Sequence, residues 1–217
     1  MFGSLCTHSL SKLSENKSDT VYKKGQMLFH EGTRPLGVYC VNSGKIKIYK
    51  LGIDGKEQIV KICTAGDLLG YRALLSEEVY PVSAEALEEA VVCFIPKQTF
   101  LGTLNEDNVF HQELLKAACK ELGMMTENLT NLAQRSVRER FAIALLMLRD
   151  TYGVDSVSNG EVEINLTRDD LANIVGTATE TLIRLLHDFK DEKLVESKGR
   201  KIKIIDPEGL AKVTSIF

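Results

Sequence analysis

The sequence lacks any apolar run long enough to cross a membrane, since its longest, Phe141 to Leu148, falls far short of the roughly 20 residues that a spanning helix needs. The N-terminus also lacks the basic start and apolar segment of a secretory signal. Glycine, serine and proline are not concentrated in any one stretch, which argues against a disordered or fibrous chain. We therefore expect a globular, cytoplasmic protein with no membrane partner.

Two further absences concern metal and charge. The five cysteines are widely spaced and form no CxxC pair, so the sequence indicates neither a disulfide framework nor a zinc site. The formal net charge is −3, so contact with a polyanion would need a local basic patch.

What is present fits two domains, the first of them rich in strands. A chain of 217 residues can bury two separate cores. From Val21 to about Phe94 short β-prone runs alternate with glycines, and Asp54-Gly55 supplies a tight hairpin turn. Many short antiparallel strands at this spacing close into a barrel or roll. The expected strands are Met27–Phe29, Val38–Val41, Lys45–Leu51, Gln58–Cys63 and Ala90–Ile95.

A long helix is expected next, from Val109 to about Arg135, because apolar residues recur there at steps of three and four. Such a stripe is typical of a coiled coil and predicts a homodimer, although it could instead pack on the strand-rich domain. The predicted seam is Leu115, Ala118, Leu122, Met125, Leu129 and Leu132.

A new helix is expected after Ser136, because Ser136 and Glu139 have the spacing of a capping box. It should run from Val137 to about Thr151 and bury one apolar face, formed by Phe141, Ala144, Leu145 and Leu148. We place a domain boundary at this break. The expected division is residues 1–108, 109–135 and 136–217.

The last third of the chain predicts a helix-turn-helix. A strand at Glu161–Leu166 leads to a short helix, Arg168–Val175, which ends at Gly176 in a left-handed conformation. The run Thr177-Ala-Thr-Glu then has the spacing to cap another helix that extends to about Lys190. Two short helices joined by a glycine-containing turn form this motif.

The outer face of this second helix carries residues that suit contact with bases. Thr179, Glu180 and Arg184 lie away from its apolar side, formed by Leu182, Leu185, Leu186 and Phe189. Arginine can bind guanine, glutamate can accept from cytosine, and threonine can contact a thymine methyl group or a phosphate. Alternatively, Glu180 only closes the helix cap and Arg184 is a solvated charge.

A basic hairpin follows, with two short strands around Gly199. A hairpin directly after a helix-turn-helix is a wing, placed to contact phosphates. This order of elements favours contact with DNA over a winged helix that binds protein. The cationic residues of the hairpin are Lys198, Arg200, Lys201 and Lys203.

These residues resemble the Crp/Fnr family of transcription regulators over nearly the whole chain. The first half resembles its cyclic-nucleotide-binding-type β-roll, and the second half resembles its helix-turn-helix more specifically. The resemblance implies an α+β fold with an N-terminal antiparallel β-roll, a long dimerisation helix and a C-terminal winged helix-turn-helix. The matching motifs are Gly25 through Glu31-Gly32, Tyr39, Ser43-Gly44-Lys45-Ile46, Asp54-Gly55-Lys56-Glu57, Ala65 to Gly70, Leu166 to Ala172, Gly176 and Thr179 to Arg184.

The resemblance also implies partners. It predicts a homodimer without enzymatic activity that binds a pseudo-palindromic operator in double-stranded DNA, and whose loop at 153–160 contacts RNA polymerase. Glu180 and Arg184 fall on base-reading positions, and Arg168 falls on a phosphate-contacting one. The expected DNA-binding residues are Arg168, Thr177, Thr179, Glu180, Arg184, Lys198, Arg200 and Lys201.

The expected effector is not cyclic AMP. Family members that bind it hold its ribose with a glutamate and its phosphate with an arginine, where this sequence has Tyr71 and Val82. Arg72 would point from the other face of an extended chain, which would leave a buried phosphate without a charged partner. The alternative is a cyclic-AMP-responsive regulator with an atypical pocket. The expected pocket is Gly70, Tyr71, Arg72, Val82, Ser83, Met125 and Thr126.

No cofactor or metal site is expected. The iron–sulfur branch of the family needs clustered N-terminal cysteines, and Cys6 stands alone there. A haem ligand could be nominated at His30 or His111. A second alternative is a metal-dependent enzyme of the cupin type, which needs several histidines on neighbouring strands. The four histidines are instead scattered over different elements, at His8, His30, His111 and His187.

Overall fold

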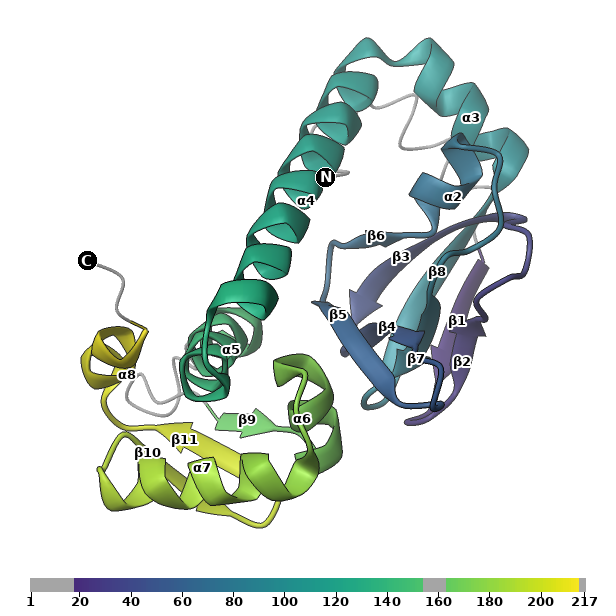
Figure 1. The fold of residues 1–217 in the computed structure, drawn as a ribbon. Coiled ribbons are helices and arrows are strands. Elements are labelled where there is room, and N and C mark those ends of the chain that lie inside the picture. Colours follow the sequence, from purple (N-terminus) through teal and green to yellow (C-terminus); the bar gives the residue numbers. More distant parts are fainter. Residues whose placement is uncertain (1–17, 154–162, 215–217) are drawn as a thin grey trace. The chain divides into compact units, whose positions relative to one another are not determined.

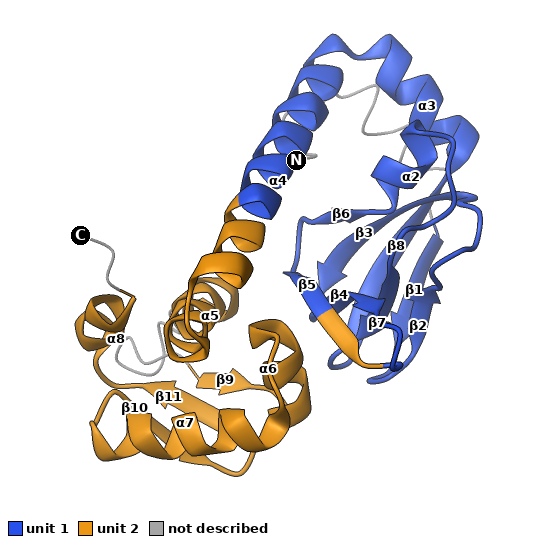
Figure 2. Cartoon of the chain, viewed as in Figure 1, with its two compact units in different colours: residues 1–55, 59–126 blue, residues 56–58, 127–217 orange. Residues whose placement is uncertain are grey.

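A computed structural model describes residues 18–153 and 163–214 of the chain (Figure 1). It contains two compact units, residues 1–55 with 59–126 and residues 56–58 with 127–217 (Figure 2). The boundary falls inside the long helix α4 (Asn108–Gln134). The predicted segment 109–135 thus matches α4 within one residue, whereas the compact units divide that helix.

The first unit is built on two sheets of four strands, with orders β1-β8-β3-β6 and β2-β7-β4-β5. In the first sheet β3 pairs antiparallel with β8, and in the second β4 pairs antiparallel with β7. The strands are β1 (Ser18–Tyr22), β2 (Met27–Phe29), β3 (Gly37–Ser43), β4 (Ile46–Leu51), β5 (Glu57–Cys63), β6 (Leu68–Leu69), β7 (Ser83–Ala86) and β8 (Ala90–Pro96), and the helices before α4 are α2 (Tyr71–Leu75) and α3 (Lys97–Glu106).

The five predicted strands are confirmed as β2, β3, β4, β5 and β8. One expectation is wrong: the chain after Gly70 is not extended but forms α2. Gly70 begins this helix with φ 81°, a left-handed conformation that glycine adopts without strain. Because α2 has only five residues, no helical periodicity could show in the sequence.

Side chains point alternately to the two faces of the sheet along β3 and β8, and both faces are buried. Val38 of β3 and Ile95 of β8 belong to the core that these strands share with the three helices. Val41 and Val92 belong to the core between the two sheets. Successive strand residues point to opposite faces, so each strand contributes to both cores.

Helix α4 begins at a side-chain cap and then leaves the core. Asp107 Oδ1 accepts hydrogen bonds from the backbone amides of Val109 and Phe110, each at 3.0 Å. Phe110 and Leu114 are buried against the β3 sheet, and no later residue of α4 is buried. The rest of the helix therefore presents its apolar stripe unburied.

The second unit packs four helices on a small sheet of order β10-β11-β9. The capping box at Ser136 is confirmed, and the four predicted apolar residues of the helix that it starts are buried. The rings of Phe141 and Phe189 stack at 5.0 Å in the core. The elements are α5 (Val137–Tyr152), β9 (Glu163–Asn165), α6 (Arg168–Val175), α7 (Thr179–Asp191), β10 (Val195–Lys198), β11 (Lys201–Ile204) and α8 (Pro207–Val213).

Arg140 of α5 holds two helix ends in the second unit. Its Nε donates to the carbonyl of Val175 at 3.0 Å, and its Nη2 donates to the carbonyl of Gly176 at 3.1 Å. Its Nη1 donates to the carbonyl of Arg135 at 3.1 Å. The last carbonyls of a helix have no partner within it, so one guanidinium satisfies groups just beyond α4 and at the end of α6.

Among the residues that the structure describes, none of the helices has the length and apolar character that a membrane span requires.

Candidate nucleic-acid interface and sensor pocket

Helices α6 and α7 form the predicted helix-turn-helix, with one correction at the turn. Gly176 ends α6 in the left-handed conformation, with φ 71° and ψ 51°. The expected cap of α7 at Thr177 is wrong, because the N-cap is Ala178, which has no side-chain hydrogen bond to give. The Thr179 hydroxyl donates to Asp169 Oδ1 at 2.8 Å, which joins the first residue of α7 to α6.

The outer face of α7 presents Glu180 and Arg184, and both side chains are exposed. Neither residue takes part in an ion pair within residues 18–153 and 163–214, and the Arg184 guanidinium makes only a long bond of 3.4 Å to the Thr181 hydroxyl. The opposite side of the helix is buried through Leu182, Leu186 and Phe189, while Leu185 is half-buried. The charged pair thus faces solvent with its hydrogen-bonding groups available.

The wing is the β10–β11 hairpin, which turns at Gly199 with φ 58°. Lys198 and Arg200 at its tip are exposed, and neither forms an ion pair in the described part of the chain. Lys201 differs, because its Nζ lies 2.6 Å from Glu163 Oε1 on β9.

Arg168 connects the first helix of the motif to the wing. Its Nη2 donates to the carbonyl of Gly199 at 2.7 Å. Its Nη1 is buried without a hydrogen-bond partner in the described structure, and burial lowers the pKa of the guanidinium. This side chain therefore positions the wing tip as well as carrying charge.

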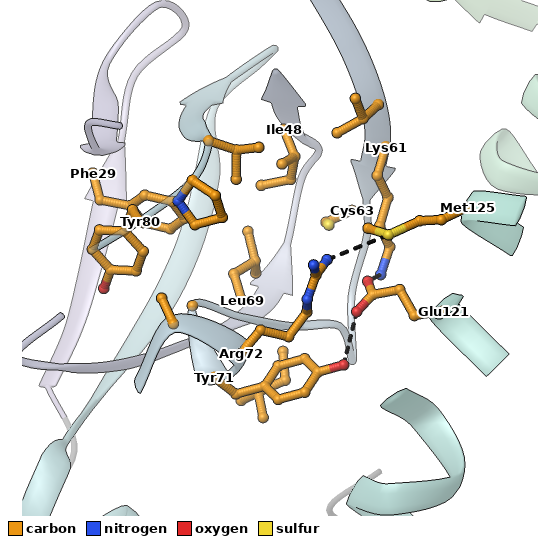
Figure 3. A pocket seen from close by; sticks show the side chains of 16 residues that line it. Phe29, Ile48, Lys61, Cys63, Leu69, Tyr71, Arg72, Tyr80, Glu121 and Met125 are labelled. Carbon is orange, nitrogen blue, oxygen red and sulfur yellow. Dashed lines mark hydrogen bonds and ion pairs between the residues drawn. The ribbon is translucent and has the colours of Figure 1, made fainter. Parts of the chain in front are cut away.

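A pocket lies in the first unit between the two sheets, α2 and the middle of α4 (Figure 3). Its volume of about 80 Å³ is below the roughly 300–1,000 Å³ of most ligand sites. The lining is mainly apolar, and Phe29 and Tyr80 stack on one side of it with ring centroids 4.0 Å apart. The lining residues are Phe29, Ile48, Val60, Lys61, Cys63, Leu68, Leu69, Gly70, Tyr71, Arg72, Ala73, Tyr80, Pro81, Val82, Glu121 and Met125.

Polar groups gather at one side of this pocket around Glu121 of α4. The Glu121 carboxylate accepts hydrogen bonds from Lys61 Nζ at 2.9 Å and from the Tyr71 hydroxyl at 2.8 Å. Burial alone would raise the pKa of Glu121, but these bonds and the nearby Arg72 lower it. Arg72 Nη1 donates only to the sulfur of Met125, at 3.6 Å, which is a weak acceptor.

Comparison with known proteins identifies both halves of the chain. Residues 19–107 match the cyclic nucleotide-binding domain, and residues 139–213 match the Crp-like helix-turn-helix domain. The anaerobic regulatory protein of Haemophilus influenzae is 31% identical over 192 residues, which are 88% of this chain and 74% of that protein. The fumarate and nitrate reduction regulatory protein of Vibrio cholerae is 30% identical over 89% of this chain and 77% of its own length.

The chain belongs to the Crp/Fnr family. Solved structures show the same fold: FixK2 from Bradyrhizobium japonicum superposes with a TM-score of 0.82 at 23% identity, covering 93% of this chain and 98% of that one. A Crp/Fnr transcriptional regulator from Thermus thermophilus gives a TM-score of 0.76 at 22% identity, covering 91% and 98%. The predicted fold class is confirmed, and the protein is a DNA-binding transcription regulator rather than an enzyme.

Within this Crp/Fnr regulator, five of the seven expected pocket residues line the pocket, namely Gly70, Tyr71, Arg72, Val82 and Met125. Ser83 and Thr126 do not line it. The buried Ser83 hydroxyl accepts from the Glu31 amide at 3.0 Å, and the Thr126 hydroxyl donates to the carbonyl of Leu122 at 3.0 Å. Arg72 lines the pocket because α2 is helical, where extended chain would have turned it away.

Sequence reasoning missed Lys61, Cys63 and Glu121 in this pocket. Lys61 and Glu121 are 60 residues apart, and a single sequence holds no signal for such a pair. The pKa of the buried Cys63 thiol is raised to about 12 by burial, so the group is protonated and unreactive at neutral pH.

The metal and polymerase hypotheses concern residues that the structure describes only in part. No group of three metal-ligating side chains occurs in the parts of the chain that the structure describes. His30, His111 and His187 are exposed and none lines the pocket, while Cys6 and His8 lie outside the described residues. The loop expected to contact RNA polymerase also lies outside them, apart from Gly153.

Proposed function

We propose that this regulator binds a pseudo-palindromic operator as a homodimer, under the control of a small effector other than cyclic AMP. The observation that carries the proposal is the exposed pair Glu180 and Arg184 on α7, which forms no ion pair among the described residues, beside a wing whose tip carries the exposed Lys198 and Arg200. Arginine is suited to guanine O6 and N7, and glutamate to cytosine N4, in the major groove. Lys198 and Arg200 then contact phosphates without regard to sequence.

The apolar stripe of α4 supports the dimer. Leu115, Leu122 and Leu129 are 59%, 67% and 68% exposed, an unusual number of large apolar side chains on one helix face. Their spacing is that of a two-stranded coiled coil, so a second copy of the same helix is the partner that fits them. Ala118 is the exception in the predicted seam, because it packs against the core of the first unit.

The pocket supports an effector different from cyclic AMP. Val82 offers no charge to a phosphate, and the Ser83 hydroxyl is already bound to a backbone amide. Lys61 is held by Glu121 and lies 3.8 Å from Asp67, so its charge is also compensated. Arg72 is the one lining cation without an ion pair in the described structure, and the Glu121 carboxylate is already bound to Lys61 and Tyr71. A cyclic nucleotide would therefore find one available cation for its phosphate and no free carboxylate for its ribose.

The proposed mechanism is a shift between two arrangements of the dimer helix. Met125 belongs both to the pocket lining and to the predicted seam, so an occupant that moves it changes the packing between two copies of α4. In the active arrangement the two recognition helices enter successive major grooves about 34 Å apart. RNA polymerase is the expected partner of the bound dimer, which acts in the cytoplasm where the DNA lies.

Substitution of Arg184 tests the base-reading role. We expect Arg184→Ala to relax base choice at one position in both half-sites, costing about 1–3 kcal/mol against the preferred base. Selection of bound fragments from random DNA with each protein measures this. An unaltered sequence preference in the variant would show that Arg184 does not read a base.

A further inference from the structure

The exposed face of α7 carries one large apolar side chain that the core does not use. Ile183 is 40% exposed, whereas the core of the unit takes Leu182, Leu186 and Phe189 from this helix. A β-branched residue on a helix surface brings no gain in helix propensity over a polar straight-chain residue. Helix propensity therefore does not account for an isoleucine at this exposed position.

The position of Ile183 places it among the proposed base-reading residues. It lies three residues after Glu180, four before His187 and directly before Arg184. Residues three or four apart share one face of a helix, and all three of these neighbours are exposed. The face that would enter the groove thus carries one apolar side chain beside Glu180 and His187.

The major groove offers one apolar group to such a side chain. Thymine presents its C5-methyl group there, while the other bases present hydrogen-bonding atoms. We propose that Ile183 recognises one thymine in each half-site by packing against this methyl group. The inference rests on the proposed function, and it adds a specificity determinant that makes no hydrogen bond.

Uracil in place of thymine gives a direct test, because it removes the methyl group and keeps every hydrogen-bonding atom of the base edge. The operator is first selected from random DNA with the wild-type protein. Each thymine of a half-site is then replaced by uracil, one at a time. At one position we expect the wild type to lose about four-fold in affinity per half-site, and about fifteen-fold when both half-sites are changed, as burial of one methyl group implies.

The Ile183→Ala variant should bind thymine and uracil equally at that position and keep its other preferences. Ile205→Ala is the matched control, since Ile205 is 43% exposed in the same unit but lies outside α7. We expect the control to distinguish the two bases as the wild type does. Circular dichroism of both variants confirms that they fold.

Two results would overturn the inference alone: a selected operator at which no uracil replacement weakens wild-type binding, or an Ile183→Ala protein with the same thymine preference as the wild type. Failure to enrich any sequence would instead contradict sequence-specific binding, and the role of Ile183 with it. The two failures are therefore distinguishable.

Discussion

The Tyr71 hydroxyl donates a hydrogen bond of 2.8 Å to Glu121, which joins the short helix α2 beside the pocket to the middle of α4. Glu121 directly precedes Leu122 of the predicted seam. The same carboxylate accepts from Lys61 on β5, so three elements meet at one charged group (Figure 3). Any occupant of the pocket that displaces Tyr71 or Arg72 alters the restraints on α4.

Loss of the Tyr71 hydroxyl should weaken this junction. We expect Tyr71→Phe to lower the free energy of unfolding by about 1–2 kcal/mol, because a hydrogen bond to a largely buried carboxylate is removed. Urea denaturation measures the change. Tyr39→Phe serves as the control, since the Tyr39 hydroxyl makes no hydrogen bond to any residue that the structure describes. Equal stability losses in both variants would contradict the role of the Tyr71 bond.

Glu121 should make the free energy of unfolding depend on pH in the acidic range. Its folded pKa is lowered below the ordinary value of 4.5, since the bonds from Lys61 and Tyr71 outweigh the effect of burial. A lowered folded pKa gives stability that is fully present above pH 4.5 and is lost as the pH falls through the folded value. Glu121→Gln should therefore be less stable than the wild type at pH 7, with a difference that shrinks in acid. A difference independent of pH would show that the charge of Glu121 is not what stabilises the unit.

The unburied stripe of α4 predicts an assembly that a single charge can break. We expect Leu129→Glu to convert the proposed homodimer into a monomer, which analytical ultracentrifugation measures. Operator affinity should then fall by about 100-fold or more, because the two half-sites no longer bind together. Leu36→Glu is the control, as Leu36 is 78% exposed and lies outside α4. A wild-type protein that sediments as one chain would refute the seam.

Arg168 and Lys198 should affect the wing in different ways. Arg168→Ala removes the bond to the Gly199 carbonyl, so hydrogen exchange of the amides at the wing tip should become faster. Lys198→Ala should leave that exchange unchanged, weaken all DNA sequences alike and reduce the slope of log affinity against log salt by about one per chain. Equal exchange rates in Arg168→Ala and the wild type would show that Arg168 does not hold the wing.

The elements predicted from the sequence are those with local signals. The capping box at Ser136, the left-handed Gly176 and the helical span of α4 each depend on residues a few positions apart, and all three are confirmed. Strand β6 and helix α2 escaped prediction because two and five residues are too few for a period to show. The cap of α7 was misplaced by one residue because the observed N-cap, Ala178, has no capping side chain by which a sequence could reveal it.

The two candidate sites also differ in how much of each could be predicted from local sequence. The recognition helix and the wing are continuous in sequence, so Glu180, Arg184 and Lys198 could be nominated from spacing. In the pocket, residues from β2 to α4 meet through the fold, and Lys61 and Glu121 gave no sign of their pairing. Ile183 was overlooked for another reason, since an apolar residue in an amphipathic helix suggests the core until its exposure is known.

The most direct test of this account is to select DNA from a random pool with the full-length protein, and then to measure the mass of the complex formed with the enriched sequence. We predict a sequence with twofold symmetry, half-site centres about one helical turn apart and two protein chains on each duplex. A pool without any enriched sequence, or a single chain bound to an asymmetric site, would contradict it.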